Sequence, residues 1–147
     1  MTLPTRRSFL AGSAAGWLLL SQGPHASPNE RARHAVIGCG GQGRAHGHAF
    51  ANQPHCAVVA VCDVDPARRA EALKDLPSPE SVAQHEDYRR IIEDPSIDTV
   101  SIATPDHWHT PIALAALQAG KHVYVEKPCC HTLREGALLV EAARQSK

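Results

Sequence analysis

A glycine-rich turn is the first group of residues whose types and spacing could do chemistry. Residues 38–43 read Gly-Cys-Gly-Gly-Gln-Gly and match the pattern G-x-G-x-x-G. In this pattern the first glycine permits a tight turn, the second lets the backbone approach a pyrophosphate, and the third lets a helix pack on a strand. The pattern alone is a weak signal, because glycine turns are common. It makes five residues candidates for binding a dinucleotide: Gly38, Cys39, Gly40, Gln42 and Gly43.

An acidic residue at a suitable distance supports this interpretation. Asp63 ends an apolar run and lies 20 residues after Gly43. A carboxylate at that place can accept hydrogen bonds from both ribose hydroxyls of NAD, and it would repel the additional phosphate of NADP. Arg68 and Arg69 lie close by and leave NADP open, although an arginine pair on a helix is more often simply solvated. We therefore expect NAD as the cofactor, with NADP as the alternative.

Two later groups of polar residues each follow an apolar run. The first contains Thr104, Pro105 and His109, and the second is Glu126-Lys127-Pro128. Loops at the carboxyl ends of parallel strands are where ligands bind in α/β folds. A lysine in such a loop carries a compact charge, and partial burial would lower its pKa. The alternative is a surface lysine in a turn, and the sequence leaves the isomer of the Lys127–Pro128 bond open.

The elements that must position these groups follow from the alternation of apolar runs and helical stretches. We expect strands at residues 34–37, 56–62, 98–103 and 121–125, with a weak one at 81–84. We expect helices at residues 42–52, 66–76, 87–93, 112–119 and from 132 to the end. The last of them begins with a capping box that starts at Thr132. Strands that alternate with helices predict an α/β fold with a doubly wound parallel sheet of the Rossmann type.

Composition places the chain among globular proteins and excludes two kinds of partner. The 147 residues are 43% hydrophobic, and 15 Lys and Arg balance 15 Asp and Glu. Nucleic acids and anionic membrane surfaces need clustered positive charge, so we expect neither as a partner. The five cysteines cannot all pair internally. A bridge from Cys39 to Cys62 stays open, because its geometry cannot be judged from sequence.

Histidine pairs offer a metal site as a second interpretation. The pairs His46 and His48, and His107 and His109, could together supply four imidazoles. His46 and His48 fall on a predicted helix, however, where residues two apart point in different directions. We therefore expect no metal. Trp108 either lines a substrate mouth or packs under its loop.

The amino-terminal segment resembles a twin-arginine signal peptide. Arg6 and Arg7 precede an apolar run over residues 9–20. This run of about 12 residues is shorter than the roughly 20 that cross a bilayer, so we expect no stable membrane span. The resemblance predicts a signal at residues 1–26, a linker at 27–33 and a cofactor domain at 34–147. It implies export to the periplasm or the extracellular space.

Residues 34–147 resemble the Gfo/Idh/MocA family, and Glu126-Lys127-Pro128 with the upstream Thr104-Pro105 and His109 is the most specific part of the match. The resemblance implies an N-terminal domain that binds NAD or NADP in an oxidoreductase of sugars or cyclitols. Thr104 and Pro105 match the turn under the nicotinamide ribose, and His109 matches a histidine at the cofactor or substrate mouth. Glu126 resembles the carboxylate that touches this ribose, and Lys127 the lysine that hydrogen-bonds the reacting hydroxyl.

Members of this family have a second domain, which carries a base and most of the sugar contacts, and this sequence lacks it. We therefore expect the chain to bind cofactor without turnover. An NAD-dependent glycosidase of the same fold is one alternative, and a non-catalytic truncated remnant is another. The last expected strand would have an open edge, which leaves a homo-oligomer open.

Overall fold

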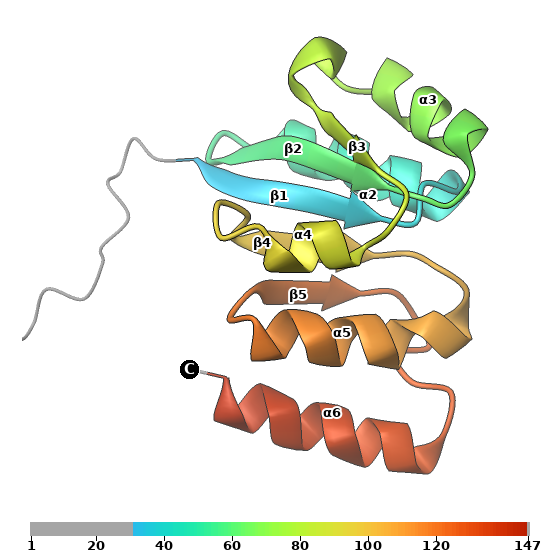
Figure 1. Cartoon of the computed structure of the whole chain (residues 1–147), viewed down its shortest axis with the longest axis vertical. Helices are drawn as coiled ribbons and strands as arrows, with labels where there is room; N and C mark the ends of the chain where they lie inside the picture. The colour runs from blue at the N-terminus through green and yellow to red at the C-terminus, as the bar shows by residue number, and fades with distance from the viewer. Residues whose placement is uncertain (1–30, 147) are drawn as a thin grey trace, which may run out of the picture. The chain divides into compact units, whose positions relative to one another are not determined.

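Five parallel strands form a single sheet in the order β3-β2-β1-β4-β5 in the computed structural model (Figure 1). Residues 31–146 are described, so the expected signal at 1–26 and most of the expected linker lie outside the described residues. The strands are β1 (Ala32–Ile37), β2 (Cys56–Cys62), β3 (Ala83–His85), β4 (Thr99–Ile102) and β5 (His122–Val125). This order confirms the predicted α/β fold with a doubly wound sheet.

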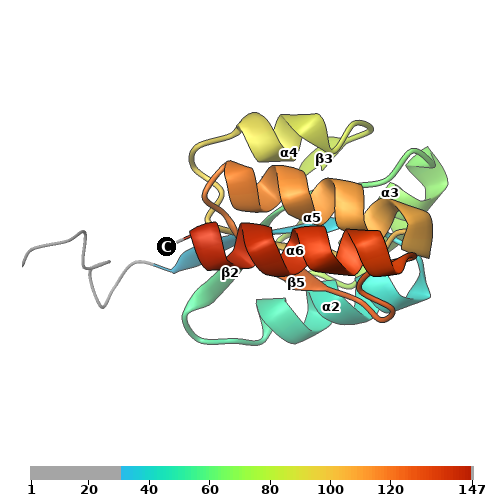
Figure 2. The same cartoon turned by 90° about the horizontal axis from the view of Figure 1, so that it is seen from below.

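Helices lie on both faces of this sheet. They are α2 (Gly41–Ala51), α3 (Pro66–Lys74), α4 (Arg89–Glu93), α5 (His109–Gln118) and α6 (Leu133–Gln145). Figure 2 shows α4 and α5 on one side of the sheet and α2 on the other, with α6 next to α5. Among residues 31–146, no helix is long and apolar enough to cross a membrane.

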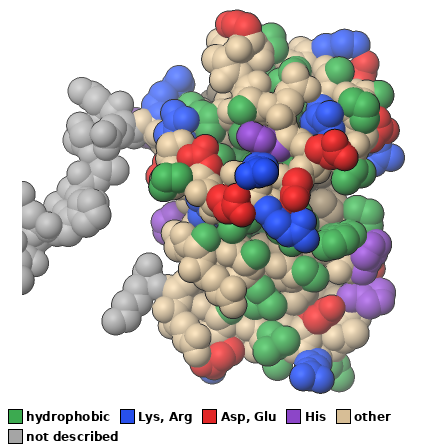
Figure 3. Space-filling view, viewed as in Figure 1, with side chains coloured by type: hydrophobic (Ala, Val, Ile, Leu, Met, Phe, Trp, Pro, Cys, Tyr) green, Lys and Arg blue, Asp and Glu red, His purple; other side chains and the backbone are tan. Residues whose placement is uncertain are grey.

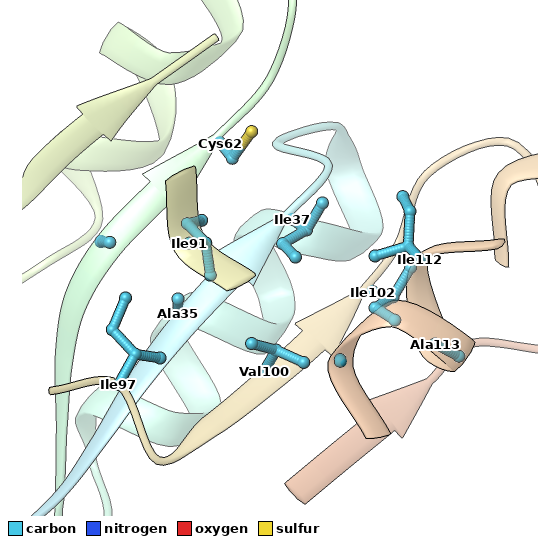
Figure 4. Packing of buried hydrophobic residues seen from close by; sticks show 11 residues of the cluster. Ala35, Ile37, Cys62, Ile91, Ile97, Val100, Ile102, Ile112 and Ala113 are labelled. Carbon is cyan, nitrogen blue, oxygen red and sulfur yellow. The ribbon is translucent and has the colours of Figure 1, made fainter. Parts of the chain in front are cut away.

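The core follows from the alternation of side chains along the strands. Ala35 and Ile37 of β1 face the α4–α5 side, whereas Val36 between them faces the α2–α3 side. Figure 4 shows Ile91 of α4 and Ile112 of α5 in the first of these clusters. Both isoleucines are at most 2% exposed, so each helix is held by burial of an apolar side chain against the sheet.

Several boundaries differ from those that the sequence predicts. Helix α5 begins at His109 instead of residue 112, so that Pro111 lies in its first turn. Proline fits there because the first N–H groups of a helix have no partner within the helix. Strand β1 begins at Ala32, inside the expected linker. A 3₁₀ turn at Pro79–Ser81 precedes β3, which therefore starts later than the predicted strand at 81–84.

Charged side chains of both signs lie interspersed on the face shown in Figure 3. On α4, Arg90 lies 3.6 Å from Glu93, and Arg89, the first residue of this helix, lies 3.0 Å from Asp87. All four side chains are exposed, so these pairs add little to stability.

A histidine is fully buried in the centre of the sheet, where the sequence predicts only an apolar strand. His34 has one ring nitrogen 2.6 Å from Thr99 Oγ1 and the other 3.0 Å from Ser101 Oγ. Its ring also stacks on Phe50 of α2 at 3.8 Å between centroids. Hydroxyl groups can donate or accept, so a neutral imidazole satisfies both contacts.

We expect the free energy of unfolding to fall as the pH is lowered below 6.5. Burial, and secondarily the charge of His46, lowers the pKa of His34 to about 3 from 6.5, so only the unfolded chain takes up this proton. The loss should be about 1.4 kcal/mol per pH unit between about pH 6.5 and 5, and it should vanish above that window.

Urea denaturation across this pH range measures the slope. His34→Gln, which keeps a donor and an acceptor, should flatten it. An unchanged slope in that variant would assign the proton uptake to another group.

Candidate cofactor and active site

The first and third glycines of the turn between β1 and α2 are required by the protein itself. Gly38 has a φ of +91°, and a Cβ on it would lie 2.6 Å from the carbonyl carbon of Ala103. A Cβ on Gly43 would lie 1.7 Å from the carbonyl oxygen of Gly38. Any side chain at either position would therefore collide with the backbone, as the tight-turn and close-packing roles of these glycines require.

The second glycine of the pattern faces open space. The nearest heavy atom to a Cβ on Gly40 would be Arg68 Nη1 at 3.8 Å, and its φ of −67° suits any residue. Gly40 is also the N-cap of α2, where it offers no side-chain oxygen to the first N–H groups of the helix. Packing within the protein does not require a glycine at position 40. A phosphate that approaches this end of the helix would require one, because it needs close access to the backbone.

Asp63 is fixed beside this turn at the end of β2. Its Oδ2 accepts the Cys39 N–H at 2.8 Å, and its Oδ1 accepts the Asp65 N–H at 2.9 Å. The Arg69 guanidinium donates to the Asp63 carbonyl. Each carboxylate oxygen keeps further acceptor capacity, so the side chain can still accept hydrogen bonds from a ribose.

The cysteine of the turn contributes only through its backbone. Cys39 is 1% exposed, and its thiol lies 3.4 Å from the Cys62 carbonyl oxygen. Burial raises the pKa of both the Cys39 and the Cys62 thiols to about 12. All five cysteines are free, so the bridge that the sequence left open is not formed.

A cavity of about 600 Å³ lies along the carboxyl ends of β1, β2 and β4. Its lining includes the predicted residues Gly38, Gly40, Asp63, Thr104 and Pro105. It also includes Val64, Asp87, Tyr88 and Trp108. Of these residues the sequence singled out only Trp108, either as part of a substrate mouth or as packing under its loop. The others could have been found from their position, since each follows β2 or β3 at the same edge of the sheet.

A second cavity of about 260 Å³ adjoins the first, because both include Ala103 and Thr104 in their walls. Gln42, His109, Glu126 and Lys127 line it. The Thr104 hydroxyl oxygen is buried and has no hydrogen-bond partner among residues 31–146. Buried hydroxyls are nearly always paired, so this unpaired atom stands out at the place where the two cavities adjoin.

His109 lines the smaller cavity, and its ring nitrogens face the protein backbone. It is 2% exposed, with Nδ1 2.7 Å from the Pro128 carbonyl oxygen and Nε2 2.8 Å from the Thr104 carbonyl oxygen. Both ring nitrogens are thus directed at protein carbonyls. The imidazole joins the turn after β4 to the turn after β5, instead of offering a nitrogen to a ligand.

Lys127 lies at the mouth of the smaller cavity, and its peptide bond to Pro128 is cis. Its side chain is exposed, so the partial burial that the sequence suggested is absent.

Glu126 beside Lys127 is held by three donors. Its Oε1 accepts from Gln42 Nε2 at 3.0 Å and from His46 Nε2 at 2.9 Å, and its Oε2 accepts the Lys127 N–H at 3.1 Å. The bond from His46, followed by those from Gln42 and Lys127, lowers the pKa of Glu126 to about 2. Sequence reasoning considered His46 only as a metal ligand and missed this contact.

Within residues 31–146, no group of three or more His, Cys, Asp or Glu side chains could hold a metal ion. His46 faces Glu126, whereas His48 lies at the surface near Asn52, so the two rings diverge as a helix requires.

Known proteins resemble this chain both in sequence and in structure. Residues 32–147 match the Gfo/Idh/MocA family, described as an oxidoreductase family with an NAD-binding Rossmann fold. Levoglucosan dehydrogenase of Pseudarthrobacter phenanthrenivorans is 37% identical over 117 residues, which are 74% of this chain and 29% of that protein. A glycosyl hydrolase family 109 protein of Saccharopolyspora erythraea is 35% identical over 125 residues, which are 81% of this chain and 27% of that protein.

A solved structure of levoglucosan dehydrogenase in complex with NADH and L-sorbose superimposes with a TM-score of 0.71 at 33% identity. The match covers 80% of this chain and 33% of that one. The chain thus spans about a third of the length of the relatives that it matches.

Proposed function

Because this chain belongs to the Gfo/Idh/MocA oxidoreductase family, we propose that its two adjoining cavities hold one NAD molecule and that the domain serves hydride transfer to or from a sugar-like substrate. Gly40 carries this proposal, since it faces the larger cavity without any steric need to be glycine. The NADH in a related solved structure supports the choice of cofactor.

In this proposal, different residues of the chain bind the two halves of NAD, one half in each cavity. We propose that Asp63 accepts hydrogen bonds from the adenosine ribose and that the N–H groups at the start of α2 bind the pyrophosphate. Thr104 and Glu126, which line the smaller cavity, then face the nicotinamide ribose. NAD, when bound, supplies the ring carbon that accepts or gives the hydride.

Lys127 is the candidate catalytic residue. Its ammonium group would stabilise the alkoxide that develops on the substrate oxygen as the hydride leaves or arrives. In residues 31–146 this side chain is exposed, so we expect the chain by itself to bind NAD without turnover. Exclusion of water from the lysine would strengthen its interaction with the developing alkoxide.

A sugar or cyclitol is the proposed substrate class. Levoglucosan dehydrogenase and its complex with L-sorbose support this choice. Relatives named as family 109 glycosyl hydrolases also match the chain, so a glycosidase that uses NAD is the competing function. Lys127 between Glu126 and Pro128 favours the dehydrogenase, because a lysine suits the polarisation of a hydroxyl or carbonyl that changes oxidation state.

Export by the twin-arginine route is a further part of the proposal. It rests on Arg6 and Arg7 before the apolar run at residues 9–20. This route carries folded proteins, which suits a domain that would bind its cofactor before export.

Isothermal titration calorimetry of this chain with NAD and NADP tests the cofactor proposal. Binding of NAD should exceed that of NADP, because the Asp63 carboxylate repels the additional phosphate. Asp63→Asn, which keeps an acceptor oxygen for only one of the two backbone N–H contacts, should weaken NAD binding by about 1 to 3 kcal/mol and narrow the preference for NAD over NADP. No heat with NAD, or the same heat for both proteins, would refute it.

A further inference from the structure

Helix α2 contributes to both cavities. Its amino-terminal end lies at the glycine turn of the larger cavity, where Gly40 is the N-cap. Gln42 in its first turn and His46 one turn later both donate to the same oxygen of Glu126, at 3.0 and 2.9 Å. Residues four apart lie on one face of a helix, so Gln42 and His46 together support the carboxylate of Glu126.

The support is largely sheltered from water. The side chains of His46 and Glu126 are only 8% and 14% exposed. The edge of the His46 ring packs on Tyr124 of β5 at 5.1 Å and 87°. A sheltered hydrogen bond of this kind fixes geometry, because the carboxylate cannot turn away without leaving a donor unpaired.

The contact with Glu126 determines which nitrogen of the His46 ring carries a proton. A carboxylate accepts, so Nε2 of His46 carries the proton in the bond to Glu126. Nδ1 is buried and has no hydrogen-bond partner among residues 31–146. His46 is therefore held in place through Glu126 and the Tyr124 ring, and Glu126 is its one polar side-chain contact in the described part of the chain.

Glu126 in turn fixes the backbone of the next residue, Lys127. Its other oxygen accepts the Lys127 N–H at 3.1 Å, so both carboxylate oxygens are engaged. On the far side of Lys127, the Pro128 carbonyl is bound by His109. The backbone around the lysine is thus fixed on both sides, and the first of these two anchors is Glu126.

We propose that His46 and Gln42 are positioning residues that orient Glu126 and Lys127 toward the nicotinamide half of the cofactor. This inference rests on the proposed binding of NAD across the two cavities. His46 lines neither cavity and Gln42 lines only the smaller one, so neither contributes to the adenosine end. Their effect should therefore be confined to ligands that carry the nicotinamide riboside.

The difference between NADH and ADP isolates this effect, since ADP has the pyrophosphate and adenosine but no nicotinamide. In the 147-residue chain, His46→Leu should weaken NADH binding about tenfold and leave ADP binding unchanged. His46→Gln keeps a donor and should recover most of the affinity for NADH. His48→Leu is the matched control on the same helix, because His48 is exposed, and it should leave both affinities unchanged.

Gln42→Leu provides a second variant at an exposed position, where unfolding is not a concern. It should show the same selective loss of NADH binding and decides the matter if His46→Leu does not fold. Equal losses for NADH and ADP, or no loss for NADH, would overturn the positioning role. A failure of the unmodified chain to bind either ligand would refute the proposed function itself.

Discussion

Replacing Gly43 with alanine is expected to destabilise the domain by about 3 kcal/mol or more. The added Cβ would lie 1.7 Å from the carbonyl oxygen of Gly38, which is backbone and cannot rotate away. Either α2 must move off the sheet or the turn must open. Urea denaturation followed by circular dichroism measures the loss, and NADH binding should disappear with it.

Gly47→Ala is the matched control for this substitution. Gly47 lies on the same helix, and its Cβ would meet only the flexible side chains of Leu76 at 3.6 Å and Val36 at 3.8 Å. These are ordinary contacts, and alanine favours a helix, so stability should be retained or rise slightly. Equal losses in the two variants would contradict the steric role of Gly43.

Replacing Gly40 with alanine should have the opposite profile: a folded protein that no longer binds NAD. Its Cβ would meet nothing nearer than 3.8 Å, and its φ of −67° suits alanine, so the free energy of unfolding should change by about 1 kcal/mol or less. The methyl group would occupy the place of the pyrophosphate. Affinity for NADH and for ADP should each fall at least about tenfold, as fluorescence and calorimetric titrations can measure.

Gly41→Ala serves as the control for Gly40→Ala. A Cβ on Gly41 would have no neighbour within 4 Å, and this glycine is at a variable position of the pattern. The Gly41→Ala variant should bind NADH and ADP with the same affinities as the unmodified chain. Retained affinity in Gly40→Ala would mean that no phosphate approaches the turn closely, and the cofactor proposal would then lose its main support.

The arrangement of the site was predictable because it depends on where strands end. Gly38, Asp63, Thr104 and Glu126 each follow an apolar run, and parallel strands bring those ends to one edge of the sheet. No side-chain detail was needed to infer that they meet. The open position of the second glycine was likewise implied by the pattern.

The contacts of the histidines were not predictable, because they depend on which side chains face one another across the fold. His34 sits in an apolar run and is satisfied by two hydroxyls of β4. His46 looks like a metal ligand until β5 places Glu126 beside α2. The spacing of residues in the sequence predicts which face of a helix or strand each side chain occupies. Which side chains come within about 3 Å of one another depends on the register of the sheet and on the rotamers.

The buried thiol in the glycine turn has a consequence for the chemical durability of the binding loop. Burial raises the pKa of Cys39 to about 12, so its thiol stays protonated at neutral pH. Alkylating agents and peroxides attack the thiolate, so this sulfur is nearly inert although it lies next to the cofactor cavity. The loop thus holds a small buried side chain beside the larger cavity without presenting a reactive thiolate.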